Sequence, residues 1–367
     1  MFFLKQTFNK AKSHLTYITS ILLFSNILFS QNYSLKGQLW YSTLTGNDIP
    51  ENDSHFESKF GTIATFSVFN KLNADQLIDF EYAHIVDHVY SGRSMINLDT
   101  IKISVFKKSI EYNTRHGIPY RFWIRYSNEK LEARLGLQKI TFGPTQILRN
   151  LSWFDYIDVT DPTGQISGVR AFRLKWFPMN TISIWSWSIL NELNNLSFGF
   201  RSEISHYSGE WAISYHNDEI TRWGLDYRYD GYFGFWNESS AISSSNLKQI
   251  IATLGLDYTL PISNGIYLMT EFMSIQQQRP IKSNQNYSAI LAAIPFGMIH
   301  QLSIIKQISL NGKKSYNFLR WSSAYDNFSL NYIFSINPKR NEYLPVIVPS
   351  GLEGFGSTIK IMLIYHY

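Results

Sequence analysis

The chain has 367 residues with no cysteine, 16% aromatic residues and only 17% charged residues. The absence of cysteine excludes a disulfide scaffold and a lipid-anchored cysteine, and the aromatic content is about twice that expected of a soluble domain. The formal charge of +5 falls to about +2 without residues 1–30, because 33 basic residues become 30 against 28 acidic ones. The composition therefore does not indicate a nucleic-acid partner.

Residues 1–30 have the pattern of a secretory signal peptide. Lysines and no acid precede the mostly apolar run "LTYITSILLFSNILFS", which ends in a small residue, Ser30. This order predicts cleavage before Gln31. The alternative is an inner-membrane anchor helix, which is disfavoured because polar residues interrupt a stretch that is already short for a span. We therefore expect residues 31–367 to form one exported domain.

Alternation with a period of two runs from "YSLKGQLWYS", directly after the predicted cleavage site, to "STIKIMLIYHY" at the end. In "LEARLGLQ" and "ITRWGLDYRY", Leu135 and Leu225 belong to an apolar face, and Arg134 and Asp226 belong to the opposite, polar face. No second layer is apparent to cover the apolar wall, which favours lipid as its surroundings, and no apolar run is long enough for a helical span. The pattern predicts an all-β fold: a single transmembrane antiparallel up-and-down β-barrel.

The connections alternate between tight turns and longer segments, as in bacterial outer-membrane barrels. The expected longer segments are 89–119, 143–168, 237–247, 276–285 and 337–354. The first of these contains a strand-like stretch that would make the strand count odd, whereas both chain ends should lie on the periplasmic side. Treating 89–119 as one outer excursion gives about eighteen strands, with about sixteen or about twenty as the alternatives.

Basic residues gather on the inward face of three consecutive predicted strands. In "YRFWIRY", Tyr120 and alternate residues after it are expected to point outward, which turns the two arginines inward, and "AFRLKW" repeats the pattern. The expected pore-lining residues are Arg121, Arg125, Arg134, Gln138, Arg173 and Lys175. Answered locally mainly by Glu132, this stripe would favour anions in the pore. The alternative is wall packing, in which acids such as Asp79 and Glu81 neutralise the cations.

The segment 143–168 is too apolar to extend freely into water, because it contains Ile147, Leu148, Leu151, Trp153 and Phe154. It therefore either folds into the barrel as a constriction or packs on the outer mouth. If it folds inward, its acids would lie opposite the wall arginines and create a transverse field across the pore. The candidate residues of this constriction loop are Arg149, Asp155, Asp158 and Asp161.

The stretch from Tyr120 to Pro178, "YRFWIRYSNEKLEARLGLQKITFGPTQILRNLSWFDYIDVTDPTGQISGVRAFRLKWFP", resembles a segment of porin-like outer-membrane proteins of the Bacteroidetes. It is similar more distantly to alginate-export-type porins, with their Gly-x-Gln strand end and Asp-Pro loop. The resemblance covers about a sixth of the chain. It implies a monomer-size barrel with a channel or transport role but no agreed substrate. Gln138, Asp155, Asp158, Asp161 and Pro162 match the family positions without an assigned role.

The function expected from these patterns is an outer-membrane porin or channel for the passive or substrate-preferring diffusion of small hydrophilic solutes, including anionic ones. The alternative is a loop-plugged structural or secretion-associated barrel. An enzyme is less favoured, because the histidine groups His84–His88 and His216–Asp218 have no recognisable serine elbow beside them. We expect no cofactor, no metal and no nucleic acid. The expected partners are outer-membrane lipid, small polar solutes and the barrel-assembly machinery, with Tyr365 and Tyr367 as the assembly signal.

Overall fold

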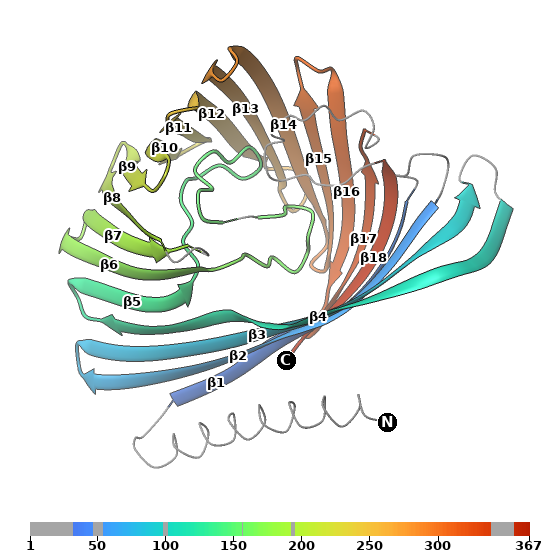
Figure 1. Ribbon diagram of the computed structural model, residues 1–367, viewed down its shortest axis with the longest axis horizontal. Helices are drawn as coiled ribbons and strands as arrows, with labels where there is room; N and C mark the ends of the chain where they lie inside the picture. The colour runs from blue at the N-terminus through green and yellow to red at the C-terminus, as the bar shows by residue number, and fades with distance from the viewer. Residues whose placement is uncertain (1–31, 47–53, 98–101, 156, 192–194, 339–355) are drawn as a thin grey trace.

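The computed structural model describes residues 32–46, 54–97, 102–155, 157–191, 195–338 and 356–367 (Figure 1). The predicted signal peptide, residues 1–30, lies outside the described residues, as does most of the expected segment 337–354. No helix among the described residues is long and apolar enough to cross a membrane.

Eighteen antiparallel strands form one sheet, in which each strand pairs with its neighbour in sequence and β1 pairs with β18. The sheet is thus a closed barrel, and the predicted fold class and the strand count of eighteen are confirmed (Figure 1). The strands are β1 Asn32–Gly46, β2 Ser54–Asn73, β3 Gln76–Asn97, β4 Lys102–Ser127, β5 Leu131–Gln138, β6 Val169–Met179, β7 Ile182–Leu190, β8 Leu196–His206, β9 Gly209–Asn217, β10 Thr221–Asp230, β11 Gly234–Ser243, β12 Lys248–Leu260, β13 Ile266–Arg279, β14 Ser283–Phe296, β15 His300–Ser309, β16 Lys314–Ala324, β17 Phe328–Ile336 and β18 Ser357–His366.

The faces of the strands follow the predicted register. Leu135 and Leu225 are 57% and 44% exposed on the outer face, whereas Asp226 is buried at 6% on the inner face and Arg134 also points inward. In β18, Leu363 and Tyr365 are exposed and alternate with buried inward residues. The barrel therefore has a continuous apolar outer face, as the alternation predicts.

Every even-numbered strand is joined to the next by a tight turn, so these turns share one rim, and the longer connections lie on the other. Three predicted connections differ from expectation. Most of 237–247 belongs to β11, which continues to Ser243. The segment 276–285 shrinks to residues 280–282, because β13 and β14 extend into it. The expected excursion 89–119 consists largely of the paired extensions of β3 and β4, which explains why it adds no strand to the barrel.

A bulge in β4 reverses one side chain. Ala83 pairs with Arg121 and His84 pairs with Pro119, so Tyr120 is the extra residue between two pairs. Such an insertion changes the direction of the local side chain. Tyr120 was expected to point outward, but its hydroxyl accepts a hydrogen bond from the backbone N–H of Ile166 inside the barrel. The expectation was wrong because strict alternation cannot include an extra residue.

The two ends of the described chain meet at the seam of the barrel. Gly37 and Tyr367 exchange both backbone hydrogen bonds, at 3.0 and 3.1 Å. The ring of Tyr367 occupies the space beside Gly37, where a Cβ atom would overlap it. Tyr367 thus completes the pairing of β18 with β1.

Deleting Tyr367, or changing it to Asp, is expected to lower the yield of folded, heat-modifiable barrel in outer membranes. The reason is that Tyr367 completes the pairing of β18 with β1, and that we expect it to act as the assembly signal. The measurement is the folded fraction on unheated gels, with Tyr325→Asp in a turn as the control. An unchanged yield for both Tyr367 variants would contradict an assembly role.

Candidate functional site

The segment 139–168, between β5 and β6, folds into the barrel instead of packing on its mouth (Figure 1). We call it the inner loop. Ile147, Leu148 and Leu151 have no exposed surface, so its apolar residues are fully covered. Of the two placements left open by the sequence, the structure has the inward one.

Two buried carboxylates hold the first half of the inner loop. Glu271 on β13 accepts hydrogen bonds from the backbone N–H groups of residues 146, 147 and 148, at 2.7, 3.0 and 2.6 Å. Glu238 on β11 accepts from the backbone of residues 145, 150 and 151, at 2.9, 3.1 and 3.2 Å. We call these contacts the carboxylate clamps. Hydrogen bonds to charged groups contribute about 1.5–3 kcal/mol each, so the clamps fix the loop firmly to this wall.

Glycine at position 143 is required for the clamp at Glu238. Gly143 has a φ of +82°, a backbone conformation that residues other than glycine rarely adopt. A Cβ atom at this position would also overlap the Glu238 carboxylate. The side chain of Asn150 adds two hydrogen bonds, to the carbonyl of Glu238 at 2.8 Å and to the hydroxyl of Thr253 at 3.2 Å. The chain can therefore pass directly over the carboxylate.

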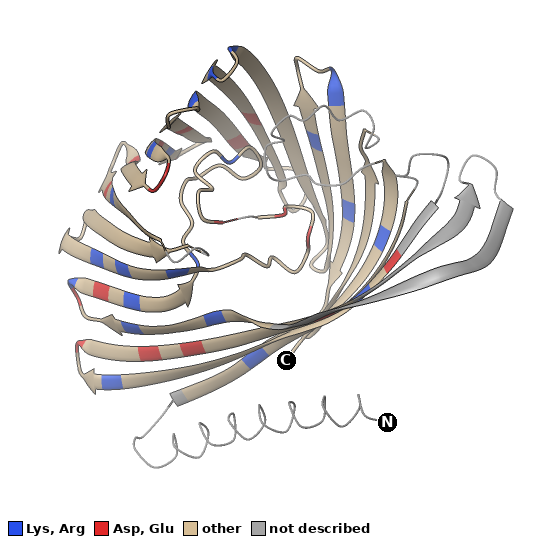
Figure 2. Ribbon diagram, in the orientation of Figure 1, with Lys and Arg blue, Asp and Glu red and all other residues tan. Residues whose placement is uncertain are grey.

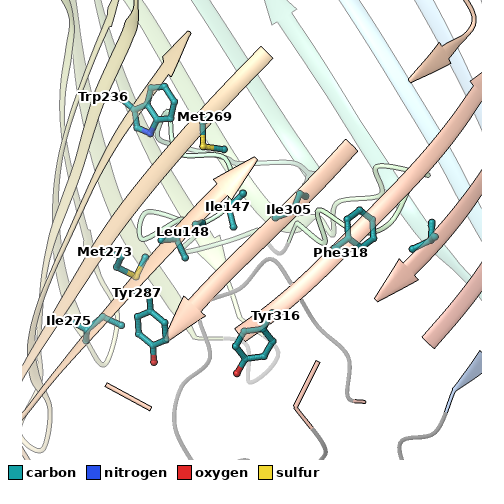
Figure 3. Packing of buried hydrophobic residues seen from close by; sticks show 12 residues of the cluster. Ile147, Leu148, Trp236, Met269, Met273, Ile275, Tyr287, Ile305, Tyr316 and Phe318 are labelled. Atoms are coloured by element: carbon teal, nitrogen blue, oxygen red, sulfur yellow. The ribbon is translucent and has the colours of Figure 1, made fainter. Parts of the chain in front are cut away.

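An apolar surface continues the contact between the inner loop and the wall. Ile147 and Leu148 pack into a cluster of inward residues from β11 and β13–β17, and Figure 3 shows most of its members around them. The cluster contains Trp236, Met269, Met273, Ile275, Tyr287, Ala289, Ile305, Tyr316, Phe318 and Ile333. Burying side chains of this size contributes about 1.5–3 kcal/mol each. The inner face of β11–β17 is thus partly an apolar platform for the loop.

The last part of the inner loop is hydrogen-bonded to β4, on the other side of the barrel from β11 and β13. Arg121 donates a hydrogen bond to the carbonyl of Ile166 at 2.6 Å, and Tyr120 accepts one from the N–H of the same residue at 2.7 Å. Gln138 has no exposed surface and donates to the carbonyl of Ala171 at 2.9 Å. Of the predicted pore-lining set, Arg121 and Gln138 therefore lie buried where the loop leaves and rejoins the wall.

The four candidate residues of the constriction loop have two different environments. Arg149 and Asp155 form a buried ion pair at 2.9 Å within the loop, and burial raises the pKa of the Asp155 carboxyl despite this partner. Asp158 and Asp161 lie further along, at half-buried turns, and accept hydrogen bonds from Thr160 and Thr163 respectively. Of the three acids, only Asp158 and Asp161 form no ion pair within 4.0 Å among the described residues.

Three arginines of the predicted stripe stand side by side on neighbouring strands. Arg125 pairs in register with Arg134, and Arg134 pairs with Arg173. Like charges directly opposite each other are destabilising. Glu132 offsets this, since its carboxylate contacts all three guanidinium groups at 3.4, 3.4 and 2.5 Å. The strand pairing thus places these three arginines next to one another in the sheet.

Further acids balance the stripe along the wall, and Figure 2 shows both signs alternating there. Asp79 binds Arg125 through two guanidinium nitrogens, and Glu203 lies 3.7 Å from Lys175. Arg201, which the sequence analysis did not identify, binds Asp226 through two hydrogen bonds of 2.6 and 3.0 Å and Glu203 at 2.8 Å. We call this set the charge ladder: Arg121, Arg125, Arg134, Arg173, Lys175 and Arg201 with Asp79, Glu81, Glu132, Glu203 and Asp226. It holds one more cation than acids.

Aromatic rings lie between the cations of the charge ladder. The Arg134 guanidinium lies 4.3 Å from the Trp123 ring centre, and Lys175 lies 4.2 Å from that of Trp185. A cation over an aromatic face gains about 0.5–1 kcal/mol at exposed sites and more when desolvated. The ladder is therefore ordered by ion pairs and by ring contacts together.

Sequence reasoning missed Glu238 and Glu271, which hold the loop. Position 238 was assigned to a loop where carboxylates are usually solvated, and Glu271 stands alone in an apolar run, "YLMTEFMSI". A single acid at an inward position of an otherwise apolar strand was the available signal, because a buried charge needs strong partners. Its partners are backbone groups of a distant segment, which no side-chain pattern indicates.

The histidine groups are involved in structural contacts. His216 is buried and accepts a hydrogen bond from the indole N–H of Trp187 at 3.2 Å, and His84 contacts the Tyr82 hydroxyl at 3.0 Å. In the part of the chain that the structure describes, no three His, Cys, Asp or Glu residues are grouped so as to hold a metal ion.

The barrel resembles solved structures over nearly its whole length. OccK7 of Pseudomonas aeruginosa aligns with a TM-score of 0.61 at 6% identity, covering 93% of this chain and 99% of that one. OccAB4 of Acinetobacter baumannii aligns at 0.58 and 9% identity, covering 92% and 99%, and OccK5 of P. aeruginosa at 0.57 and 8%, covering 92% and 97%. No protein-family model and no curated protein sequence matches the chain.

At such low identities the likeness concerns the fold alone. Together with the register and the inner loop, it places the protein in a structural class: closed 18-stranded antiparallel barrels with an apolar outer face and a charged wall inside.

Proposed function

We propose that the protein is an outer-membrane porin, a channel that lets small hydrophilic solutes diffuse across the membrane, and not an enzyme. The observation that carries this is the contrast between the two faces of one closed barrel. Large apolar side chains cover the outside, whereas ion pairs such as those of Glu132 and Asp226 line the inside. An apolar band outside a polar lumen is the arrangement of barrels that conduct solutes through an outer membrane.

The test is single-channel conductance in a planar lipid bilayer. The refolded barrel is expected to give stepwise ohmic currents in KCl. Heat-unfolded protein at the same concentration is the control. Absence of steps from a barrel shown to be folded and inserted would overturn the channel.

A plugged barrel is the second candidate, favoured by the tight fit of the inner loop. The carboxylate clamps and the covered side chains of Ile147 and Leu148 are features that would also suit a permanent plug. In that case the protein acts through partners, as a structural or secretion-associated barrel. No single-channel current is then recorded in the bilayer. The likeness to alginate-export-type porins and an origin in the Bacteroidetes remain predictions.

The charge ladder is proposed to give the channel a mild preference for anions. The side chains of Arg125 and Arg134 keep 25% and 17% of their surface exposed, whereas Arg121, Arg173 and Arg201 are buried. Changing Arg125, Arg134 and Arg173 to Gln together is expected to move the reversal potential in a KCl gradient toward cation preference. The shift should be smaller at 1 M salt, where the Debye length falls to about 3 Å.

The control for this experiment is Lys130→Gln, which removes a cation from an exposed turn. The control is expected to leave the reversal potential unchanged. A parent that prefers cations, or a triple variant that behaves like the parent, would show that the arginines serve only to pair with Asp79 and Glu132.

A further inference from the structure

A second group of charges faces the inner loop from β16, β18 and β2, next to the strands of the charge ladder. Arg320 on β16 pairs in register with Ile333, Ile333 with Lys360 on β18, and Lys360 with Leu44 on β1. Directly paired residues point to the same face, and Ile333 is buried inside the barrel. Arg320 and Lys360 therefore project into the lumen at one level.

The same level continues onto β2. Leu44 pairs with Glu57, and Lys59, two residues further, points to the same side. Glu57 and Lys59 form an ion pair at 3.0 Å. The wall group consists of Arg320, Lys360, Lys59 and Glu57, with a formal charge of +2.

The inner loop places its two unpaired acids toward this wall group. Asp161 interacts electrostatically with both Arg320 and Lys360, and Asp158 with Lys360. Among the described residues no direct ion pair joins the two sides. Each loop acid is instead held in place by a threonine, at 2.6 and 2.7 Å. Two negative charges thus interact with a wall group of formal charge +2 without an ion pair within 4.0 Å among the described residues.

One polar atom at this level has no partner. The Nε of Arg320 is buried and makes no hydrogen bond with any described residue. A buried donor without an acceptor is unfavourable, and a solute oxygen or a water molecule would satisfy it. Arg134 and Arg173 of the charge ladder also have an unsatisfied Nε, but each of these guanidinium groups forms an ion pair with Glu132, whereas Arg320 forms no ion pair among the described residues. The unpaired guanidinium atom therefore points to an acceptor that is not part of the protein.

We propose that Asp158 and Asp161, together with Arg320, Lys360 and Lys59, form a dipolar binding site that selects small zwitterionic solutes, with the carboxylate toward the wall and the ammonium toward the loop. This inference rests on the proposed channel and adds the solute class. Opposite charges of equal size on two sides attract neither a simple anion nor a simple cation strongly. They stabilise a molecule that carries both charges, because each end lies in a favourable potential.

The experiment compares four solutes of equal heavy-atom number in proteoliposomes at neutral pH: alanine (zwitterion), lactamide (neutral), lactate (anion) and alaninamide (cation). In the parent, alanine is expected to enter on the order of tenfold faster than lactamide, as focused fields raise local concentrations by at least this factor. Arg320→Gln with Lys360→Gln should bring alanine down to the rate of lactamide and favour alaninamide over lactate. Asp158→Asn with Asp161→Asn should also remove the alanine preference but favour lactate.

The control variant is Arg228→Gln, which removes a cation near the rim on β10, across the barrel from β18. It should keep the preference of the parent for alanine. Equal rates for alanine and lactamide in the parent, or a preference that survives both double variants, would overturn the dipolar site while lactamide uptake upholds the channel. Absence of all uptake by a folded, inserted barrel would overturn the channel, and the dipolar site with it.

Discussion

Replacing Glu238 and Glu271 together by Gln is expected to release the inner loop, raise the single-channel conductance and make the open current noisy. An amide keeps one acceptor oxygen but loses the charge that strengthens three N–H bonds at each clamp. Hydrogen bonds to charged groups contribute about 1.5–3 kcal/mol each and neutral ones about 0.5–1.5 kcal/mol, so each clamp is weakened by the change. Conductance and current noise are measured in planar bilayers.

A second measurement separates loop release from a change of charge in the pore. In the double variant trypsin should cut the detergent-folded barrel within the inner loop, at Lys139 or Arg149, whereas the parent should resist. Glu129→Gln with Glu219→Gln is the matched control, since it removes the same charge from exposed turns. Parent-like conductance and protease resistance in the clamp variant would mean that the apolar platform alone holds the loop.

Leu225→Arg is expected to lower the free energy of unfolding by about 2–4 kcal/mol, the cost of an arginine on the lipid face near the midplane. Leu225 is in the middle of β10 and 44% exposed on the outer face. The measurement is the urea-dependent equilibrium between folded and unfolded barrel in lipid vesicles.

Thr65→Arg is the matched control for this change. Thr65 on β2 lines an inner cavity of about 410 Å³, so that a long charged side chain at this position remains in water. The control is expected to change stability little. If Thr65→Arg were the more destabilising of the two, the assignment of inner and outer faces would be reversed.

The register and the strand count could be predicted from the sequence because they depend on local alternation. Leu135 opposite Arg134, and Leu225 opposite Asp226, follow from the period of two and hold for whole strands. Errors arose where a strand departs from strict alternation or where its end is polar. The bulge at Tyr120 and the continuation of β11 through Ser243 are examples.

The sequence by itself determined the barrel, the inward side of the basic stripe and the apolar character of the inner loop, since each is encoded in neighbouring residues. Only the tertiary structure decided what those charges meet. Glu238 and Glu271 bind backbone groups roughly a hundred residues away, and Asp161 interacts electrostatically with Arg320 and Lys360 on strands far along the chain. The physical reason is that closing the barrel brings distant strands to one level, and a charge takes its partner from that level and not from its neighbours in the chain.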